Sequence, residues 1–324
     1  MQNTPGIHHI TAIAGDAQKN LDFYSGILGL RLVKKTVNYD DPGTYHLYYG
    51  DASGSPGSIL TFFPWTSSGF RGRPGPGQVT TISFSVPTGS LGFWAQRLKS
   101  LGTDYQGPRE RSDGTFIALR DPDGMSVELV DAGSPASNDA WTGRVPGASA
   151  IRGFHSAALS VRDAEATARF LTSVLGFAAA DGSDGRLRFS TGAAGIGTIA
   201  DVVGSPDGPA GRMGAGAIHH IAWRAGDDAL QLLLRSQVTD AGTPATAVID
   251  RTYFHSVYFQ EPGGILFEIA TDPPGFTVDE PADRLGASLM LPAWLESSRA
   301  QIEKALPPLE AEAANGGEAW TQAV

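Results

Sequence analysis

The chain repeats one pattern four times, and this repetition limits the fold more than any other feature. Each unit starts with an apolar strand, continues with an amphipathic helix that ends near a glycine, and finishes with further strands; the units start near residues 7, 79, 153 and 217. One such unit is too small to close a sheet around a core. Four units therefore predict an α+β protein in which βαβββ modules pair into two curved mixed sheets, each around a cavity with helices outside.

The segments of each unit follow from hydrophobic spacing and turn residues. The expected helices cover residues 16–28, 90–101 and 228–237, with a fourth around 168–175. The expected later strands lie at 31–37, 44–49, 57–63, 116–120, 125–130, 187–190, 198–203, 254–260 and 264–270. The sequence Asp-Pro-Asp-Gly at 121–124 predicts a hairpin turn, because a calcium loop needs further ligands that are absent.

The chain is expected to divide at residues 133–150, which are rich in Gly, Ser, Pro and Asn and predict a linker. We expect two units in a domain at 5–132 and two in a domain at 151–272. A tail at 273–324 breaks the repeat. Within it, residues 294–306 predict an amphipathic helix, and the small, polar stretch 311–324 is expected to fray.

Composition excludes several classes of function. Lys plus Arg number 24 and Asp plus Glu 34, so the net charge is −10, which disfavours binding to nucleic acid or to an anionic membrane surface. Cysteine is absent, so a metal site must use the seven histidines or carboxylates. The N-terminus has no secretory signal pattern, and no apolar run is long enough to span a membrane. We therefore expect a soluble, cytoplasmic protein.

Two His-His pairs, at 8–9 and 219–220, stand at matching positions of the first and fourth units. Adjacent residues on a strand face opposite sides, so one histidine of each pair faces the sheet interior. Three groups that can converge in one cavity are His9, His220 and Glu268, the last from the final strand of unit four. Two imidazoles and one carboxylate form the facial triad that holds Fe(II) with positions left open. Units one and four must then share that cavity.

Units two and three are predicted to form a metal-free partner. Glu128 matches Glu268 in position, but no histidine lies near Ile82, where unit two would need one. In unit three, Ser156 aligns with His9. Glu128 is therefore interpreted as a structural relic or a salt-bridge partner. His46, in a strand of unit one, remains either a core or a pocket residue at this point.

These motifs resemble the vicinal oxygen chelate superfamily, which includes glyoxalase I, extradiol dioxygenases and fosfomycin-resistance proteins. The likeness is strongest to bacterial hydroquinone-type ring-cleaving dioxygenases and covers nearly the whole chain. It is carried by the stretches at 6–11, 23–24, 29–36, 45–49, 152–156, 218–220 and 263–268. In that family the ligands correspond to the second histidine of each pair and the glutamate. The resemblance thus implies His9, His220 and Glu268 as ligands of Fe(II), and an N₂O donor set also admits Mn(II).

The resemblance also implies pocket residues. Arg251 and Tyr258 match family residues at the ring oxygens of the substrate, and His8 and His219 match pocket residues. A hydroquinone must lose a proton and gains from a donor at the developing oxyanion, which an arginine and a tyrosine supply. His255 is either a further pocket residue or exposed. Five aromatic residues are candidates for pocket walls, with core packing favoured for most of them: Phe62, Phe63, Trp65, Trp223 and Phe254.

The leading interpretation is a non-haem Fe(II) enzyme that cleaves a hydroquinone or related dihydroxy-aromatic ring with O₂. Its partners would be a small aromatic substrate and O₂, with no nucleic acid or membrane, and the tail helix would permit a homo-oligomer. One alternative is a glyoxalase-like metal-dependent isomerase or lyase, although that chemistry usually uses four protein ligands. The other is a non-catalytic protein that binds a small aromatic molecule.

Overall fold

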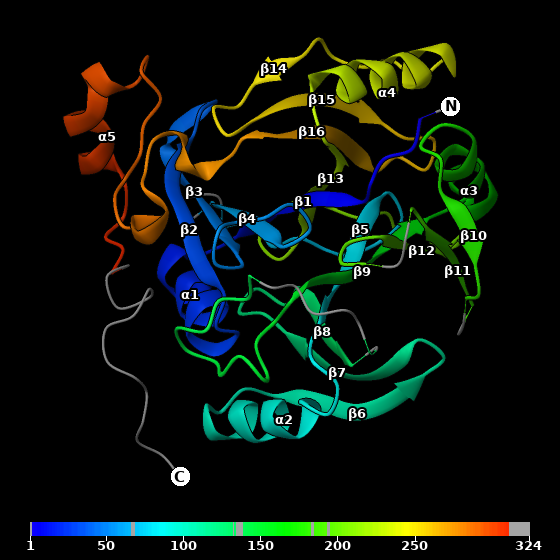
Figure 1. The fold of residues 1–324 in the computed structure, drawn as a ribbon, viewed down its shortest axis with the longest axis horizontal. Coiled ribbons are helices and arrows are strands. Elements are labelled where there is room, and N and C mark those ends of the chain that lie inside the picture. The colour runs from blue at the N-terminus through cyan, green and yellow to red at the C-terminus, as the bar shows by residue number, and fades with distance from the viewer. Residues whose placement is uncertain are drawn as a thin grey trace.

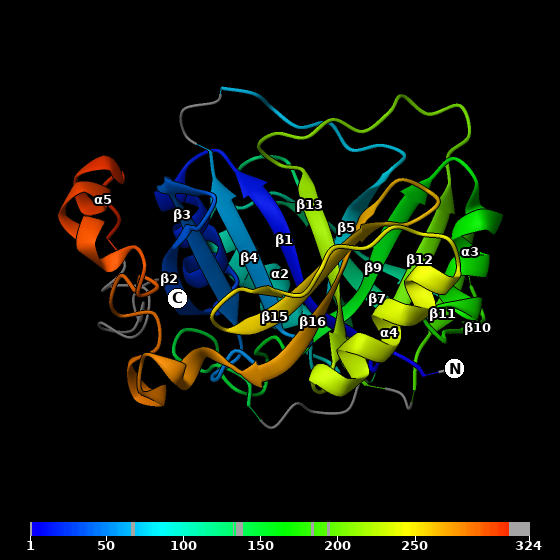
Figure 2. The ribbon, with the colours of Figure 1, turned by 90° about the horizontal axis from the view of Figure 1, so that it is seen from above.

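The computed structural model describes residues 2–65, 69–131, 133, 139–182, 185–192 and 195–310. Within these residues the strands form two eight-stranded sheets, both curved and mixed (Figures 1 and 2). The predicted fold class is therefore confirmed. The predicted fraying of 311–324 concerns residues outside the described part of the chain.

The first sheet combines unit one with unit four. Its strand order is β14-β15-β16-β13-β1-β4-β3-β2, and β1 runs antiparallel to β13 where the two units join. Both central neighbours, β4 and β16, pair in parallel with the joining strands. The strands are β1 (Ile7–Ala14), β2 (Arg31–Asn38), β3 (Asp41–Gly50), β4 (Ile59–Pro64), β13 (Ile218–Ala225), β14 (Ile249–Asp250), β15 (Phe254–Gln260) and β16 (Leu266–Pro274).

The second sheet combines units two and three in the same way, with β5 antiparallel to β9 at its centre. Its strands are β5 (Gln78–Ser85), β6 (Tyr105–Arg111), β7 (Gly114–Arg120), β8 (Ser126–Asp131), β9 (Gly153–Val161), β10 (Ala178–Ala180), β11 (Arg186–Ser190) and β12 (Ile199–Gly204). Each sheet thus takes one unit from either side of the linker. The division into domains at 5–132 and 151–272 separates halves of the sequence rather than sheets, and it stays a prediction about folding units.

Three strands that the sequence pattern does not predict lie at sheet edges. They are β6, β10 and β14, and their residues are mostly exposed. An edge strand with both faces in water needs no alternation of apolar and polar residues, so hydrophobic spacing gives no signal there. The turn at 121–124 joins β7 to β8 as expected, because the Asp121 carboxylate accepts hydrogen bonds from the backbone N–H groups of Asp123 and Met125.

Helices lie outside the sheets, as the repeat predicts (Figure 1). They are α1 (Ala17–Leu21), which continues as a π-helix over Asp22–Ile27, α2 (Leu91–Ser100), α3 (Ala164–Ser173) and α4 (Asp228–Asp240). The apolar sides of α2, α3 and α4 bury Trp94, Leu171 and Leu234 completely. This burial places the apolar core between helices and sheets, and it leaves the concave faces of the sheets for polar groups. No described helix has the length and apolarity needed to cross a membrane.

The tail packs against the open edge of unit one. The Lys34 side chain of β2 is fully buried, and its Nζ lies 2.6 Å from Oδ1 of Asp279 and 2.5 Å from Oε2 of Glu280. The last helix, α5, covers Arg299–Ala305 and begins later than the predicted residue 294. The chain before it forms a turn after Pro292 and a short 3₁₀ helix, so the regular helix starts only after these tighter turns.

Candidate metal centre

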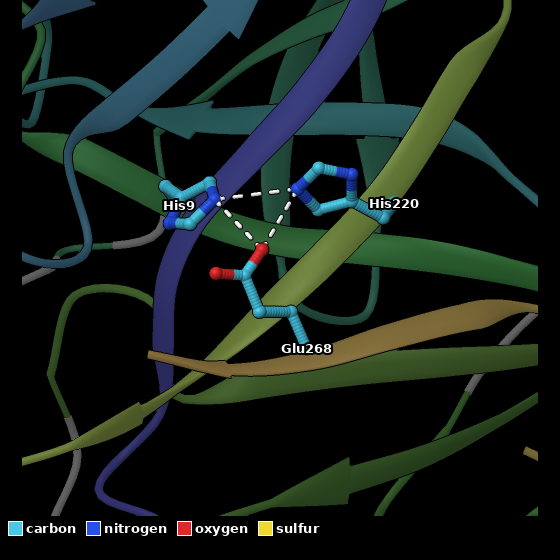
Figure 3. A group of neighbouring side chains, drawn as sticks. All are labelled: His9, His220 and Glu268. Carbon is cyan, nitrogen blue, oxygen red and sulfur yellow. Dashed lines mark hydrogen bonds and ion pairs between the residues drawn. The ribbon is translucent and has the colours of Figure 1, made fainter. Parts of the chain in front are cut away.

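His9, His220 and Glu268 converge on one point inside the first sheet (Figure 3). Oε2 of Glu268 lies 2.9 Å from Nε2 of His220 and 3.3 Å from Nε2 of His9, and the two Nε2 atoms are 3.3 Å apart. All three side chains are buried. Among the residues that the structure describes, no other group of three histidines and carboxylates brings its ligand atoms so close.

Strand register explains the convergence. His9 of β1 lies opposite Ala222 of β13, and Ala222 lies beside Glu268 of β16. His220 is two residues before Ala222, so its side chain faces the same side of β13. The methyl group of Ala222 is small enough to leave room for the three larger side chains around it. Units one and four therefore share the cavity, as the two His-His pairs predict.

The three side chains fit a divalent metal ion. Ligand atoms about 3 Å apart are what one ion with bonds of about 2.1 Å requires. Oε1 of Glu268 accepts a hydrogen bond from Ser256 Oγ at 2.5 Å, which fixes the carboxylate. Oε2 of Glu268 is buried and, within the described part of the chain, accepts no well-formed hydrogen bond. A buried carboxylate oxygen normally has a partner, and a bound metal ion would provide one here. Burial raises the pKa of Glu268, but His9 and His220 outweigh it and hold the pKa well below its ordinary value.

The outer histidine of each pair holds the ring of the inner one. Nδ1 of His8 lies 2.9 Å from Nδ1 of His9, and Nδ1 of His219 lies 2.8 Å from Nδ1 of His220. If each inner ring donates its Nδ1–H to its neighbour, its Nε2 lone pair is free to bind a metal. Burial first, and then the adjacent histidine, lower the pKa of His8 well below its usual value and the pKa of His219 to about 4. Both outer rings are therefore neutral acceptors near pH 7.

A cavity of about 290 Å³ opens onto the ligands. His219 contributes to its wall, whereas His8 is not among the lining residues. Of the five aromatic candidates, Phe63, Trp65 and Phe254 line the cavity, while Phe62 and Trp223 are fully buried in the core. The walls thus offer flat apolar surfaces close to a polar centre, a combination suited to a small planar ring.

Arg251 and Tyr258 face the same cavity. The Arg251 guanidinium carbon lies 5.6 Å from the centre of the Tyr258 ring, and its Nη1 lies 3.4 Å from a carboxylate oxygen of Asp40 at the rim. Burial raises the pKa of Tyr258, so its hydroxyl keeps its proton and can donate. His255 points elsewhere: its Nδ1 lies 2.6 Å from Oδ1 of Asp228, and it does not line the cavity.

Some cavity residues escape the sequence interpretation. His46, left above as either a core or a pocket residue, lines the cavity. Thr11 and Tyr48 line it too; they lie in the stretches 6–11 and 45–49 but received no role there. A signal was present, because Thr11 follows His9 by two positions on one strand and Tyr48 follows His46 by two on another. Residues two apart on a strand share a face, so each of these pairs belongs to one side of the sheet.

The second sheet has the same register without the histidines. Ser156 and Glu128 both lie opposite Ser83 of β5, so they occupy the positions that His9 and Glu268 take in the first sheet. Both equivalences agree with the alignment of the repeats. Thr81, two residues before Ser83, stands where the first sheet has His220.

Glu128 is held by a cation from the protein itself. Nη1 of Arg111 lies 3.1 Å from Oε2 of Glu128, and Ser83 donates a hydrogen bond to the same oxygen at 2.7 Å. Nε of Arg111 also lies 2.6 Å from Oδ1 of Asp113, and Nη2 of Arg188 lies 2.6 Å from Oδ2 of Asp113. In the second sheet, guanidinium groups neutralise the carboxylates, as a metal ion would do in the first sheet. Of the two interpretations of Glu128, structural relic or salt-bridge partner, the structure supports the salt-bridge partner.

Fold, repeat and metal-ligand geometry together define a class of protein. A family model described as "Glyoxalase/Bleomycin resistance protein/Dioxygenase superfamily" matches residues 6–129 and 153–269, and the chain belongs to that superfamily. It is 46% identical over 310 residues to "Putative ring-cleaving dioxygenase MhqO" of Bacillus subtilis (strain 168), covering 95% of this chain and 98% of that protein.

Two further comparisons agree. The chain is 33% identical to the "Chlorohydroquinone/hydroquinone 1,2-dioxygenase" of Sphingobium indicum, covering 93% of this chain and 95% of that protein. The crystal structure of a "putative dioxygenase" from Bacillus subtilis subsp. subtilis str. 168 superposes with a TM-score of 0.92 at 45% identity, covering 96% of this chain and 99% of that one. The resemblance found in the sequence is thereby confirmed, and these relatives support an oxidoreductase of the dioxygenase type.

Proposed function

We propose that this protein is an Fe(II)-dependent ring-cleaving dioxygenase that acts on a hydroquinone or a related dihydroxy-aromatic compound with O₂. The observation that carries the proposal is the buried set of His9, His220 and Glu268, whose two histidines line a cavity with aromatic walls. The name of the Sphingobium relative supports the substrate class. Three protein ligands leave open positions on the metal, whereas glyoxalase-type lyases usually use four.

Each part of the site has a chemical task in this proposal. When bound, the ferrous ion supplies open coordination positions and the one-electron chemistry that O₂ needs. Phe63, Trp65 and Phe254 hold the ring by apolar contact. Arg251 and Tyr258 face the cavity with a permanent cation and a protonated hydroxyl, and both stabilise negative charge that develops on a ring oxygen.

Oxygen uptake after anaerobic loading with Fe(II) tests the function. We expect the loaded protein to consume one O₂ per hydroquinone, and Mn(II) loading shows which metal supports the reaction. Turnover of a glyoxal–thiol adduct without oxygen uptake would replace the proposal with the lyase alternative. Binding of the aromatic compound with no metal retained would replace it with the binding-protein alternative.

A further inference from the structure

Four side chains form a hydrogen-bonded chain through the cavity wall, and the proposed function gives this chain no task. Oη of Tyr48 lies 2.9 Å from Nδ1 of His46. Nε2 of His46 lies 2.8 Å from Oγ1 of Thr61, which in turn lies 2.8 Å from Oγ1 of Thr11. Thr61 is fully buried, while the other three residues line the cavity. Both ends of the chain therefore face the space where a substrate would bind.

The first end lies beside the metal ligands. Thr11 follows His9 by two positions on β1, so both side chains face the same side of the sheet. The imidazole of His46 is held in one orientation, since its ring centre is 4.0 Å from that of Tyr48 and 4.2 Å from that of Phe63. The hydrogen-bonded side chains thus form a fixed path that starts at the metal site and runs across the neighbouring strands β1, β4 and β3.

Counting protons shows what the chain can do. Burial lowers the pKa of His46 well below its ordinary value, and His9 and His220 lower it further, so the ring is neutral and carries one N–H. The three hydroxyl groups and this N–H supply four protons for three hydrogen bonds. One proton is left at one end, and an acceptor is left at the other. Which end donates depends only on the tautomer of His46.

We propose that the chain from Thr11 to Tyr48, here called the Thr11–Tyr48 relay, removes the proton of a ring hydroxyl bound beside Thr11. This proposal rests on the proposed function. The ring hydroxyl gives its proton to Oγ1 of Thr11, and each hydroxyl passes its own proton onward. His46 takes a proton at Nε2 and releases one from Nδ1, and Tyr48 releases its proton to water. The ring is left as a phenolate, and no relay group changes its charge.

Thr61 offers a matched pair of variants. Thr61→Val keeps the volume of the side chain and removes the hydroxyl in the middle of the relay, while Thr61→Ser keeps the hydroxyl. Each protein is loaded with Fe(II) and mixed with hydroquinone without O₂. A pH-indicator dye follows proton release in stopped flow, tryptophan fluorescence follows binding, and iron content is measured for each variant.

We expect wild type and Thr61→Ser to release the proton as fast as hydroquinone binds. Thr61→Val should release it about 100-fold more slowly, the scale typical of a lost proton-transfer group, with affinity unchanged. His46→Gln should behave like Thr61→Val, because an amide cannot take up a proton at one atom and release one at another. It also serves as the second variant if Thr61→Val does not fold.

The outcomes separate the relay from the proposed function. Equal rates of proton release in wild type, Thr61→Val and His46→Gln would overturn the relay, even in a protein that consumes O₂ with hydroquinone. Proton release that depends on the Thr61 hydroxyl, in a protein that consumes no O₂, would support the relay and overturn ring cleavage. A wild-type protein that binds no hydroquinone would overturn both.

Discussion

Glu268 and Glu128 occupy matching positions in the two sheets, yet different neighbours surround them. Glu268 faces two imidazoles, whereas Glu128 is paired with Arg111. Glu268→Ala or His220→Ala should therefore abolish retention of Fe(II), because two remaining ligands cannot hold the ion. Glu128→Gln is the control and should leave the iron content unchanged. Metal analysis after gel filtration measures both, and stoichiometric iron in Glu268→Ala would rule out the assigned ligand set.

His155, in the second sheet, gives a pH prediction at a single residue. Its pKa is lowered from the ordinary value of 6.5 to about 4, mainly because burial removes water from the ring. As the pH falls below 6.5, the unfolded chain takes up the proton and the folded chain does not. The stability present above pH 6.5 is therefore lost progressively as the pH falls to about 4, by about 3 kcal/mol in total.

Substitution of His155 isolates this loss. Between pH 7 and pH 5, the wild type should lose about 2 kcal/mol more unfolding free energy than His155→Gln, whose side chain does not titrate. Urea unfolding of both proteins in the presence of a chelator measures the difference without a contribution from bound metal. Parallel losses in the two proteins would show that His155 is not kept neutral by the fold.

How far single residues are predictable depends on how much chemistry their pattern contains. His9, His220 and Glu268 are predictable because paired histidines recur at matching places in two repeats. Thr61 is not, since a threonine in an apolar strand looks like any β-branched core residue. Its importance comes from strand register, which places it beside Thr11, and register between distant segments has no local signature.

At the scale of elements, hydrophobic spacing predicts the strands that are buried and misses those that are exposed. The strands β1, β5, β9 and β13 are almost entirely buried and stand out in the sequence. The edge strands β6, β10 and β14 are exposed and leave no such pattern. The tail helix is predicted in place but begins late, because the preceding residues form turns that propensity alone does not reveal.

The tail is attached to the first sheet by a buried charge, and this attachment is testable. Lys34→Ala would leave Glu280, which is 6% exposed, without its cation. We expect a loss of about 3–5 kcal/mol of unfolding free energy in urea, the usual cost of stranding one partner of a buried pair. Arg299→Ala is the control: its ion pairs with Glu296 and Glu303 are on the surface and should contribute less than about 1 kcal/mol. Equal effects of the two changes would contradict the anchoring role.

At the scale of the whole molecule, the four units make two sheets of the same design with different contents. The repeat predicts four modules, but hydrophobic spacing alone does not say which modules pair. The pairing of unit one with unit four follows only from the chemistry, since the metal ligands must meet. Conversely, the second sheet keeps the register of the first and places an ion network where the first places histidines.

If strand register determines where the metal site forms, substitutions at the matching positions should create a metal site in the second sheet. Thr81→His and Ser156→His together place two imidazoles, relative to Glu128, in the positions that His220 and His9 hold relative to Glu268 in the first sheet. Arg111 must also become Ala, because its guanidinium otherwise neutralises that carboxylate. We expect the triple variant to bind two Fe(II) or Zn(II) per chain, against one in the wild type, by anaerobic titration with metal analysis. The double variant that keeps Arg111 should still bind one, since the arginine competes with the metal for Glu128. One metal per chain in a folded triple variant would show that strand register alone does not make this site.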